Sequence, residues 1–267
     1  MNDRWLIALD VDGTILREDG SHSEVVFEEI RRVAALGHLV TLATGRSWET
    51  TRPILVELGI TPSHVVCSNG ALIMARDEDS ADGYRREHIE VFDPSEVLAT
   101  LQENLPNAHY LVEDADGFRR YTDATLDWEL SHGELSSHEE LAAYPATRVV
   151  VVSPDHDTEE FLAVVGRMGL HQVSYSIGWT AWLDIAPAGV NKATAAERVR
   201  QWADIPASRV FAAGDGRNDL EMFAWARAEG VAVAMGQSPD EVRTAASQVT
   251  GTVDDDGLAE ALLRIIR

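Results

Sequence analysis

The segment LIALDVDGT, residues 6–14, joins a short apolar run to two carboxylates and a glycine. Leu6–Leu9 is typical of a strand buried in a parallel sheet. In extended chain Asp10 and Asp12 project to the same side, where they repel each other unless a cation lies between them or one holds a proton. Gly13 lets the chain turn away. The pattern favours Asp10 as an attacking carboxylate and Asp12 as an acid that protonates a leaving group, although such residues are also common in solvated turns.

The next segments repeat the pattern of a short strand followed by polar residues or glycine. Leu39–Ala43 is followed by Thr44-Gly45-Arg46, and Val65–Cys67 by Ser68-Asn69-Gly70. Helices are predicted over residues 23–36 and from a cap at Ser47 to Leu58, where Gly59 is a stop signal. Alternating strands and helices predict a parallel sheet with its site at the carboxyl edge.

The middle of the chain changes character after an acidic stretch of small residues, 77–83, which indicates a boundary. The predicted elements of this middle part are a helix opened by Asp93-Pro94-Ser95-Glu96 with proline at its first position, a strand at Arg148–Val152, a helix at Thr158–Met168, and a hairpin of Val173–Ile177 and Ala181–Ile185. The last part of the chain resumes the first pattern. Its predicted elements are a helix at Lys192–Trp202, strands at Val210–Ala213 and Val231–Ala234, a helix capped by Ser238 with Pro239 at its first position, and a final helix over 257–267. We therefore expect an α/β fold. Residues 1–83 and 187–267 then form one unit with a parallel sheet, and 84–186 form an inserted α+β unit.

A second acidic motif, Gly214–Asp219, closes the strand at 210–213. If this strand lies beside the first one, Asp215 comes close to Asp10 and Asp12. Such a cluster of hard oxygen ligands suits Mg²⁺ and not a soft metal. Alternatively, Asn218 or Asp219 could simply cap the next helix.

The basic residues point to one anion site. Twenty-one of the 22 are arginine, and Lys192 is the only lysine. An ammonium is a compact point charge, whereas a guanidinium is a planar fork. Thr44-Gly45-Arg46 offers a hydroxyl and a backbone N–H at a helix start, and Lys192 near another helix start can reach the same phosphate. Together with Mg²⁺ these groups would stabilise a phosphoryl group during its transfer.

Composition excludes several classes of partner. The 267 residues are 45% apolar and 25% charged, as in an ordinary globular protein, and the formal net charge of -23 argues against nucleic acid or an anionic membrane as a partner. Adaptation to salt is a less favoured reason for this acidity than a solvated surface.

The single cysteine, Cys67, rules out an internal disulfide. Neither a signal peptide nor a long apolar run is present, so we expect a cytoplasmic protein. The sequence leaves open whether it is a monomer or a small homo-oligomer.

Four segments together resemble the haloacid dehalogenase superfamily of phosphatases, in order and in spacing. They are Asp10–Thr14, Thr44–Arg46, Lys192 and Gly214–Asp219. The further segments Ser68–Ala71, Gly189–Lys192, Val233–Gly236, Val249-Thr250 and Asp256–Leu258 look like the Cof-type branch with a C2B-type cap. The resemblance implies that residues 1–83 and 187–267 form a Rossmann-like, doubly wound catalytic core, and that 84–186 form an inserted α+β cap domain that sets substrate specificity. It covers the core, while the cap is similar only in size and position.

The resemblance implies a role for each matching residue. Asp10 would form an aspartyl-phosphate and bind Mg²⁺, Asp12 would be the acid/base and lend its carbonyl to the metal, and Asp215 would be the third protein ligand. Asn218 and Asp219 would orient Lys192 or metal-bound water. The catalytic set is then Asp10, Asp12, Thr44 and Lys192. The phosphate-binding set is Asp12, Gly13, Thr44, Gly45, Arg46, Asn69, Lys192 and Asn218.

One departure from the family pattern and several cap residues bear on this reading. Gln237-Ser238 replaces the usual asparagine-alanine, which could alter loop geometry. Trp179 and Trp182 could stack on a substrate ring, although such aromatics are more often core. The cap histidines His132, His138 and His156 lie in polar surroundings and are typical of a surface.

The sequence thus predicts a Mg²⁺-dependent phosphatase acting on a small phosphorylated metabolite, a sugar phosphate or a cofactor phosphate, through a covalent intermediate on Asp10. Two alternatives remain. A phosphosugar mutase would return the phosphoryl group to another hydroxyl, and a regulatory protein would bind the phosphometabolite without turnover.

Overall fold

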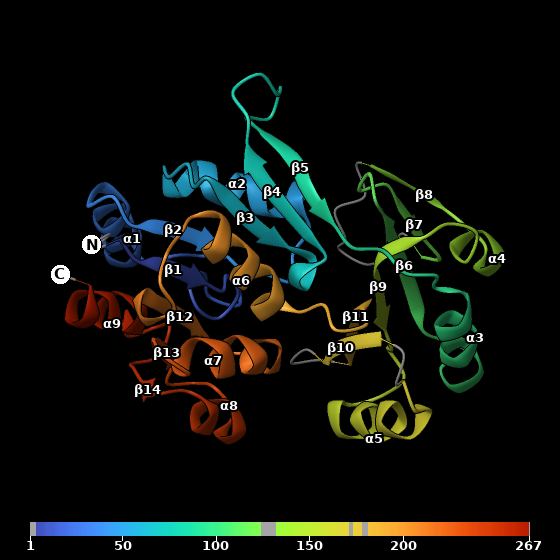
Figure 1. The fold of residues 1–267 in the computed structure, drawn as a ribbon. Helices are drawn as coiled ribbons and strands as arrows, with labels where there is room; N and C mark the ends of the chain where they lie inside the picture. Colours follow the sequence, from blue (N-terminus) through green and yellow to red (C-terminus); the bar gives the residue numbers. More distant parts are fainter. Residues whose placement is uncertain (1–3, 124–131, 171–172, 178–180, 267) are drawn as a thin grey trace. The chain divides into compact units, whose positions relative to one another are not determined.

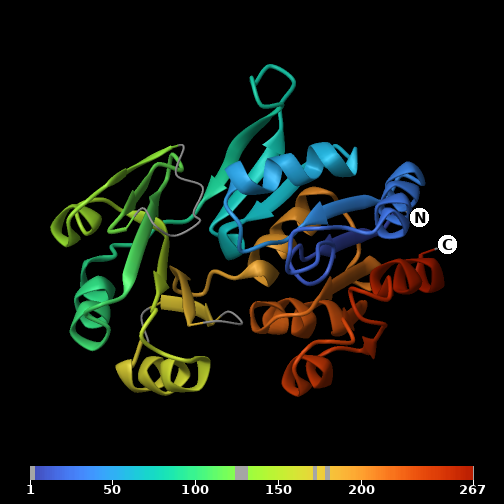
Figure 2. The ribbon, with the colours of Figure 1, turned by 180° about the vertical axis from the view of Figure 1, so that it is seen from behind.

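The computed structural model describes residues 4–123, 132–170, 173–177 and 181–266 (Figures 1 and 2). The chain divides into two compact units, residues 1–87 with 191–267 and residues 88–190. These divisions lie after residues 87 and 190, whereas residues 83 and 186 were expected. The first lies later because β5 (Tyr84–Ile89) adds to the sheet that contains β4 (Leu72–Arg76). In the described part of the chain, no helix is both long and apolar enough to cross a bilayer.

A parallel sheet forms the centre of the first unit (Figure 1). Its strands, in spatial order, are β14 (Gln248–Val249), β13 (Val231–Ala234), β12 (Val210–Gly214), β1 (Leu6–Leu9) and β2 (Leu39–Leu42). Leu9 pairs with Ala213 of β12 on one side and with Leu42 of β2 on the other. The predicted strands β1, β2 and β12 are therefore neighbours, and the residues that follow them meet at one edge.

A second, smaller sheet extends this unit. It contains β3 (His64–Cys67), β4 and β5, and β3 runs antiparallel to β4. A parallel bridge between Ala43 and Val66 joins β3 to the end of β2. The carboxyl end of β3 thus lies at the same edge as those of β1 and β2.

The predicted helices of the first unit are present, and α7 (Leu220–Arg227) adds one whose bounds were not predicted. The helices of this unit are α1 (Glu24–Ala35), α2 (Trp48–Leu58), α6 (Lys192–Trp202), α7, α8 (Asp240–Ala245) and α9 (Gly257–Ile265), with short 3₁₀ turns η1 (Ser68–Gly70), η2 (Ala207–Arg209) and η3 (Arg217–Asp219). The Ser47 side chain caps α2, and Gly59 ends it in the left-handed conformation with φ 69°. The Asn191 side chain accepts the Thr194 N–H at 3.0 Å, which fixes Lys192 as the first residue of α6.

Two predicted helix starts are wrong by one residue. Helix α8 begins at Asp240, so Pro239 is the residue before the helix, and Ser238 does not cap it. The Ser238 N–H closes a turn on the Met235 carbonyl at 3.1 Å, and its buried hydroxyl has no hydrogen-bond partner among the described residues. Helix α3 (Ser95–Asn104) likewise begins after Pro94, not with it. Proline fixes φ but leaves ψ free, so either side of the helix start accepts it.

The second unit is a six-stranded, mostly antiparallel sheet with helices on one face. The strands, in spatial order, are β10 (Val173–Ile177), β11 (Trp182–Pro187), β9 (Ala146–Val152), β6 (His109–Asp114), β7 (Arg119–Tyr121) and β8 (Gly133–Leu135). Helices α3 and α5 (Thr158–Met168) share an apolar core with the sheet, in which Leu101, Tyr110 and Phe161 are buried. The predicted hairpin of β10 and β11 is present, whereas β6, β7, β8 and α4 (His138–Leu141) were not predicted.

Glu197 connects α6 to α7 and offers a pH-dependent test of this packing. It accepts from Arg200 Nε at 2.7 Å and from Trp225 Nε1 at 2.9 Å. The Arg200 guanidinium, helped by Trp225 and Gln201 and opposed by partial burial, lowers the pKa of Glu197 to about 2. Because the folded pKa lies below the unfolded one, this stabilisation is present above pH ~4.3 and is lost as the pH falls toward 2.

We expect Glu197→Gln to lower the free energy of unfolding by about 1 kcal/mol at pH 7, a modest value because the Glu197 side chain is 31% exposed. The difference from wild type should shrink below pH ~4.3, as followed by urea denaturation at several pH values. Glu260→Gln is the control, since its pair with Arg264 is 3.5 Å long and exposed, and we expect it to cost less than about 0.5 kcal/mol. An equal cost of Glu197→Gln at pH 7 and pH 3 would contradict the ion-pair account.

Candidate active site

Asp10 occupies the first position after β1, at the centre of the carboxyl edge. Its N–H donates to the Ala213 carbonyl at 2.9 Å, so the backbone is still held by β12 while the side chain leaves the sheet. The carboxylate is 5% exposed. Its Oδ1 accepts from Lys192 at 2.6 Å and its Oδ2 from the Thr14 hydroxyl at 3.4 Å. The strand therefore fixes Asp10 with both oxygens oriented.

Lys192 is wholly buried and lies between two carboxylates. Its Nζ donates to Asp10 Oδ1 at 2.6 Å and to Asp219 Oδ1 at 2.8 Å. Burial would lower the pKa of Lys192, but Asp10 and Asp219 raise it above its ordinary value, so the ammonium stays charged. An ammonium carries three N–H donors, and these two contacts use two of them.

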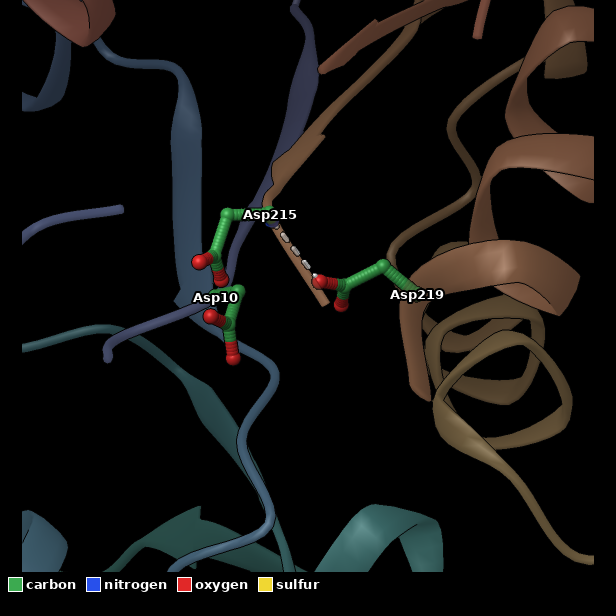
Figure 3. A group of neighbouring side chains, drawn as sticks. All are labelled: Asp10, Asp215 and Asp219. Atoms are coloured by element: carbon green, nitrogen blue, oxygen red, sulfur yellow. Dashed lines mark hydrogen bonds between the residues drawn. The ribbon is translucent and has the colours of Figure 1, made fainter. Parts of the chain in front are cut away.

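Asp219 is a buried anchor for the neighbouring motif. Besides Lys192, it accepts at Oδ2 from the N–H groups of Asp215 and Gly216, both at 3.0 Å. Figure 3 shows Asp219 opposite Asp10 and Asp215, with the bond to the Asp215 backbone dashed. Asp219 thereby links the motif after β12 to the ammonium of α6.

Three buried carboxylates, those of Asp10, Asp215 and Asp219, each offer an oxygen within 4.8 Å of the others (Figure 3). Burial raises the pKa of Asp10 to about 7, supported by Asp219 and Asp12 and opposed by Lys192. Burial and the Asp10 and Asp219 carboxylates raise the pKa of Asp215 to about 8. Three carboxylates face one ammonium, so full ionisation leaves an excess of two negative charges. A divalent cation bound by carboxylate oxygens fits this donor set and this charge.

Asp12 projects from the same segment as Asp10 but has a different environment. Its carboxylate is 56% exposed and lies outside the group that could hold a metal. Arg46 binds it with both arms of the guanidinium, Nε to Oδ2 at 2.8 Å and Nη2 to Oδ1 at 2.5 Å. The Arg46 side chain, expected at the phosphate, is thus directed at Asp12, and this contact was not foreseen from the sequence.

The remaining predicted phosphate-binding residues form one connected network at the ends of β2 and β3. The buried Thr44 hydroxyl accepts the Arg46 N–H at 3.1 Å, and the Asn69 N–H donates to the Thr44 carbonyl at 3.0 Å. Asn218 Nδ2 donates to Asn69 Oδ1 at 3.2 Å. A Cβ on Gly45 would lie 3.1 Å from the Asn69 amide. Asn69 itself has φ 49°, an uncommon conformation for a residue with a side chain.

Gly13 packs directly against Asp215. Its φ is 76°, and a Cβ there would lie 2.1 Å from Asp215 Oδ2. The residue is therefore required for two reasons, the left-handed backbone and the space that the carboxylate fills. The close approach explains how the segment after β1 can bring Asp10 and Asp215 together.

Gln237 is a site residue that sequence reasoning missed. Its Nε2 donates to the Gly13 carbonyl at 2.5 Å and its Oε1 accepts the Val253 N–H at 3.0 Å. The side chain thus ties the turn after Asp12 to the loop after β14. The departure from the family's asparagine at this position was the signal, since glutamine reaches one methylene further.

The cap residues singled out from the sequence divide into described and undescribed ones. Trp182 is partly buried and packs with Leu111 and Val150, and Trp179 lies outside the described residues. His132 and His138 contact the rings of Phe118 and Tyr110, and His156 Nδ1 lies 2.7 Å from Ser153 Oγ.

Known proteins are similar to this chain in sequence or in fold over nearly their whole length. The family model of haloacid dehalogenase-like hydrolases matches residues 7–262. The chain is 27% identical to the 5-amino-6-(5-phospho-D-ribitylamino)uracil phosphatase YitU of Bacillus subtilis, covering 97% of this chain and 96% of that protein. It is 26% identical to the pyridoxal phosphate phosphatase YbhA of Escherichia coli, covering 96% of each. A solved sugar phosphatase of the haloacid dehalogenase subclass IIB has the same fold, with a TM-score of 0.78 at 18% identity and coverage of 97% and 98%.

The contact between Gly13 and Asp215 gives a test of the cation site. We expect Gly13→Ala to weaken Mg²⁺ binding, measured by isothermal titration calorimetry, by at least about tenfold, because the new methyl group displaces the Asp215 carboxylate. Gly20→Ala is the matched control. Gly20 has a similar φ of 80°, but nothing lies within 4 Å of its added Cβ. If both variants bound Mg²⁺ equally well, the crowding at Asp215 would not matter to the cation.

Proposed function

The chain belongs to the haloacid dehalogenase-like hydrolases and is a phosphoric monoester hydrolase, and from this premise we propose that it dephosphorylates small metabolites through an aspartyl-phosphate on Asp10. The observation that carries the proposal is the orientation of Asp10. Its carboxylate is held by Lys192 and Thr14 at the end of a central strand, among the residues that the family's motifs match.

The reaction has two steps, each performed by residues of this chain. In the first, an Asp10 oxygen attacks phosphorus, the bond from phosphorus to the ester oxygen breaks, and protonated Asp12 gives its proton to the leaving oxygen. In the second, water attacks the phosphorus of the aspartyl-phosphate, Asp12 takes the proton, and Asp10 is released with inorganic phosphate. The Asp12 carboxylate suits both tasks because it is 56% exposed. Its pair with Arg46 would have to open as substrate enters, because a guanidinium favours the ionised carboxylate.

The proposed cofactor is Mg²⁺, held by the carboxylates of Asp10 and Asp215 and by the Asp12 carbonyl. When bound, Mg²⁺ would neutralise charge on the phosphate and so allow an anionic nucleophile to approach it. Asp219 is proposed to support the site and not to bind the ion, because it already accepts three hydrogen bonds, one from Lys192 and two from the N–H groups of Asp215 and Gly216.

The positive groups of the site would hold the phosphoryl oxygens. Lys192 has a third N–H donor beyond its contacts with Asp10 and Asp219. Thr44 accepts the Arg46 N–H, which leaves its own hydroxyl proton to donate. These two donors are fixed before substrate arrives, which is the property that electrostatic catalysis needs.

The substrate class is a small phosphorylated metabolite, either a sugar phosphate or a cofactor phosphate. The relatives act on a phosphoribitylamino-uracil and on pyridoxal phosphate, and both names describe a phosphate monoester on a small organic molecule. The proposed place of action is the cytoplasm, in keeping with the buried single thiol of Cys67.

We expect Asp10→Asn to lower kcat on p-nitrophenyl phosphate by more than about 10⁴-fold, because an amide cannot form the aspartyl-phosphate. The fold should persist because Lys192 keeps its contact with Asp219. Circular dichroism checks this, and the exposed Asp254→Asn should retain full activity. Hydrolysis surviving in folded Asp10→Asn would rule out the covalent route.

Incubation of the protein with hexose 1-phosphates distinguishes a phosphatase from a mutase. Release of free phosphate without formation of an isomerised sugar phosphate would exclude a mutase.

We expect Lys192→Arg to reduce kcat/KM by about 10²-fold or more, because a planar guanidinium cannot replace a buried point charge between two carboxylates. Arg198→Lys, an exchange at an exposed position of the same helix, should leave kcat/KM near the wild-type value. Both variants are assayed with saturating Mg²⁺. Near-normal kinetics of Lys192→Arg would mean that any cation at this position suffices.

A further inference from the structure

Gln237 lies in the loop after β13 and reaches two other segments with its side-chain amide. Its Nε2 donates to the Gly13 carbonyl at 2.5 Å, and its Oε1 accepts the Val253 N–H at 3.0 Å. These two partners fix the orientation of the amide, because a carbonyl needs a donor and an N–H needs an acceptor. Gln237 therefore connects the turn after β1 to the loop after β14 in one defined way.

The backbone beside Gln237 is itself held in place. The Met235 N–H donates to the Gly214 carbonyl at the end of β12 at 3.0 Å, and the Gly236 N–H donates to the Gly251 carbonyl at 2.9 Å. A Cβ on Gly236 would lie 3.0 Å from backbone atoms of the loop that contains Gly251, so the two loops are in close contact. The side chain of Gln237 thus extends from a loop that is anchored to the central sheet.

The turn at Gly13 is held partly from inside and partly from outside. The N–H groups of Ile15 and Leu16 donate to the Val11 carbonyl, both at 2.9 Å, and the Gly13 N–H donates to the Leu16 carbonyl at 2.7 Å. The Gly13 carbonyl is bound from outside the turn, by Gln237. Glycine has the widest choice of backbone conformations, and Gly13 has φ 76°. The external hydrogen bond therefore restrains the most adaptable residue of the turn.

Three groups of the active site lie next to the Gly13 carbonyl along the chain or in space. Asp12, the proposed acid, precedes it. Thr14 follows it, is fully buried, and donates its hydroxyl to Asp10 Oδ2 at 3.4 Å. The Asp215 carboxylate fills the space that a Cβ on Gly13 would occupy. A rotation of the peptide between Gly13 and Thr14 would therefore disturb the acid, the hydroxyl that orients the nucleophile, and the packing of a proposed cation ligand.

We propose that Gln237 is a positioning residue for phosphoryl transfer, which acts through the Gly13 carbonyl to hold Asp12 and the nucleophile Asp10 in their reactive arrangement. This role rests on the proposed function, which assigns the acid and the nucleophile. The hydrogen bonds of Gln237 go to backbone groups, so it acts through geometry and not through charge. A displacement of about 1 Å at reacting groups can lower a rate by about 10²-fold, so one such contact is enough to matter.

A positioning role separates the effect on kcat from the effect on KM. The groups proposed to hold the phosphate, Lys192 and Thr44, lie at the start of α6 and after β2, outside the turn that Gln237 holds. Loss of the contact should therefore lower kcat more than it raises KM, because the arrangement of acid and nucleophile is expressed in the transition state. A purely structural role would lower the free energy of unfolding and leave the kcat of the folded enzyme unchanged.

The test removes the donor at position 237 and keeps the length of the side chain. Gln237→Glu places an acceptor oxygen against the Gly13 carbonyl, and Gln237→Met has neither a donor nor an added charge. With saturating Mg²⁺ and p-nitrophenyl phosphate, we expect each variant to lower kcat by at least about tenfold and to keep KM within about threefold of wild type. The control Gln248→Glu adds the same charge on exposed β14, where Gln248 accepts from Arg264 at 2.9 Å, and it should keep the wild-type kcat.

Hydrogen exchange in the turn gives a readout that does not depend on catalysis. The N–H groups of Gly13, Ile15 and Leu16 are hydrogen-bonded within the turn, so their exchange rates, measured by NMR in the Mg²⁺-loaded protein, report how firmly the turn is held. We expect exchange at least about tenfold faster in Gln237→Glu and Gln237→Met than in wild type. Gln248→Glu should exchange at the wild-type rate.

The outcomes separate this role from the proposed function. A wild-type protein without hydrolase activity would overturn the proposed function and this role with it. An active wild type together with a near-normal kcat in Gln237→Met, or with unchanged exchange in the turn, would overturn this role alone. A low kcat confined to Gln237→Glu would assign the effect to charge and would also overturn it. If Gln237→Met does not fold, Gln237→Asn replaces it with the same expectation, because its amide reaches one methylene less far.

Discussion

The ammonium of Lys192, buried between Asp10 and Asp219, is the interaction on which the site depends. It joins three segments that are far apart in the chain, since Lys192 is 182 residues from Asp10 and 27 from Asp219. A charge buried so completely is stable only when it is paired and hydrogen-bonded. Each carboxylate is held in turn, Asp10 by Thr14 and Asp219 by backbone N–H groups. The elements that carry these residues must therefore lie where they do, or the ammonium would be buried without partners.

The charges around Lys192 also explain why a cation fits beside it. One ammonium cannot balance Asp10, Asp215 and Asp219, and burial adds to their mutual repulsion, as the raised pKa values of Asp10 and Asp215 show. The backbone brings these carboxylates together, because Gly13 leaves the space that the Asp215 side chain fills. Gln237 then fixes the Gly13 carbonyl from another loop. The fold thus holds three mutually repelling carboxylates together, and this repulsion favours a positive ligand among them.

At the opposite edge of the sheets, arginines are paired with carboxylates. Arg76 pairs with Glu78 at 3.0 Å, and Arg85 pairs with Glu87. Parallel strands make both arrangements possible, because their amino ends and their carboxyl ends form two separate edges. The second unit carries its own core, with helices α3 and α5 against one sheet face, and it contributes none of the residues discussed at either edge of the first.

The sequence by itself determined the features that depend on residues close together along the chain, namely individual strands, helix ends and short motifs. Apolar runs and capping residues predicted β1, α2, α5 and α6 within a residue, and the motifs after the strands indicated the chemistry and the family. Local signals failed where the chain offered two close alternatives, as at Pro94 and Pro239, and where strands had only three residues, as at β7 and β8. Only the tertiary structure decided that Arg46 pairs with Asp12 and that Gln237 holds Gly13. Those contacts follow from strand order and from the need of buried or crowded charges for partners, and no stretch of sequence contains both ends of such a contact.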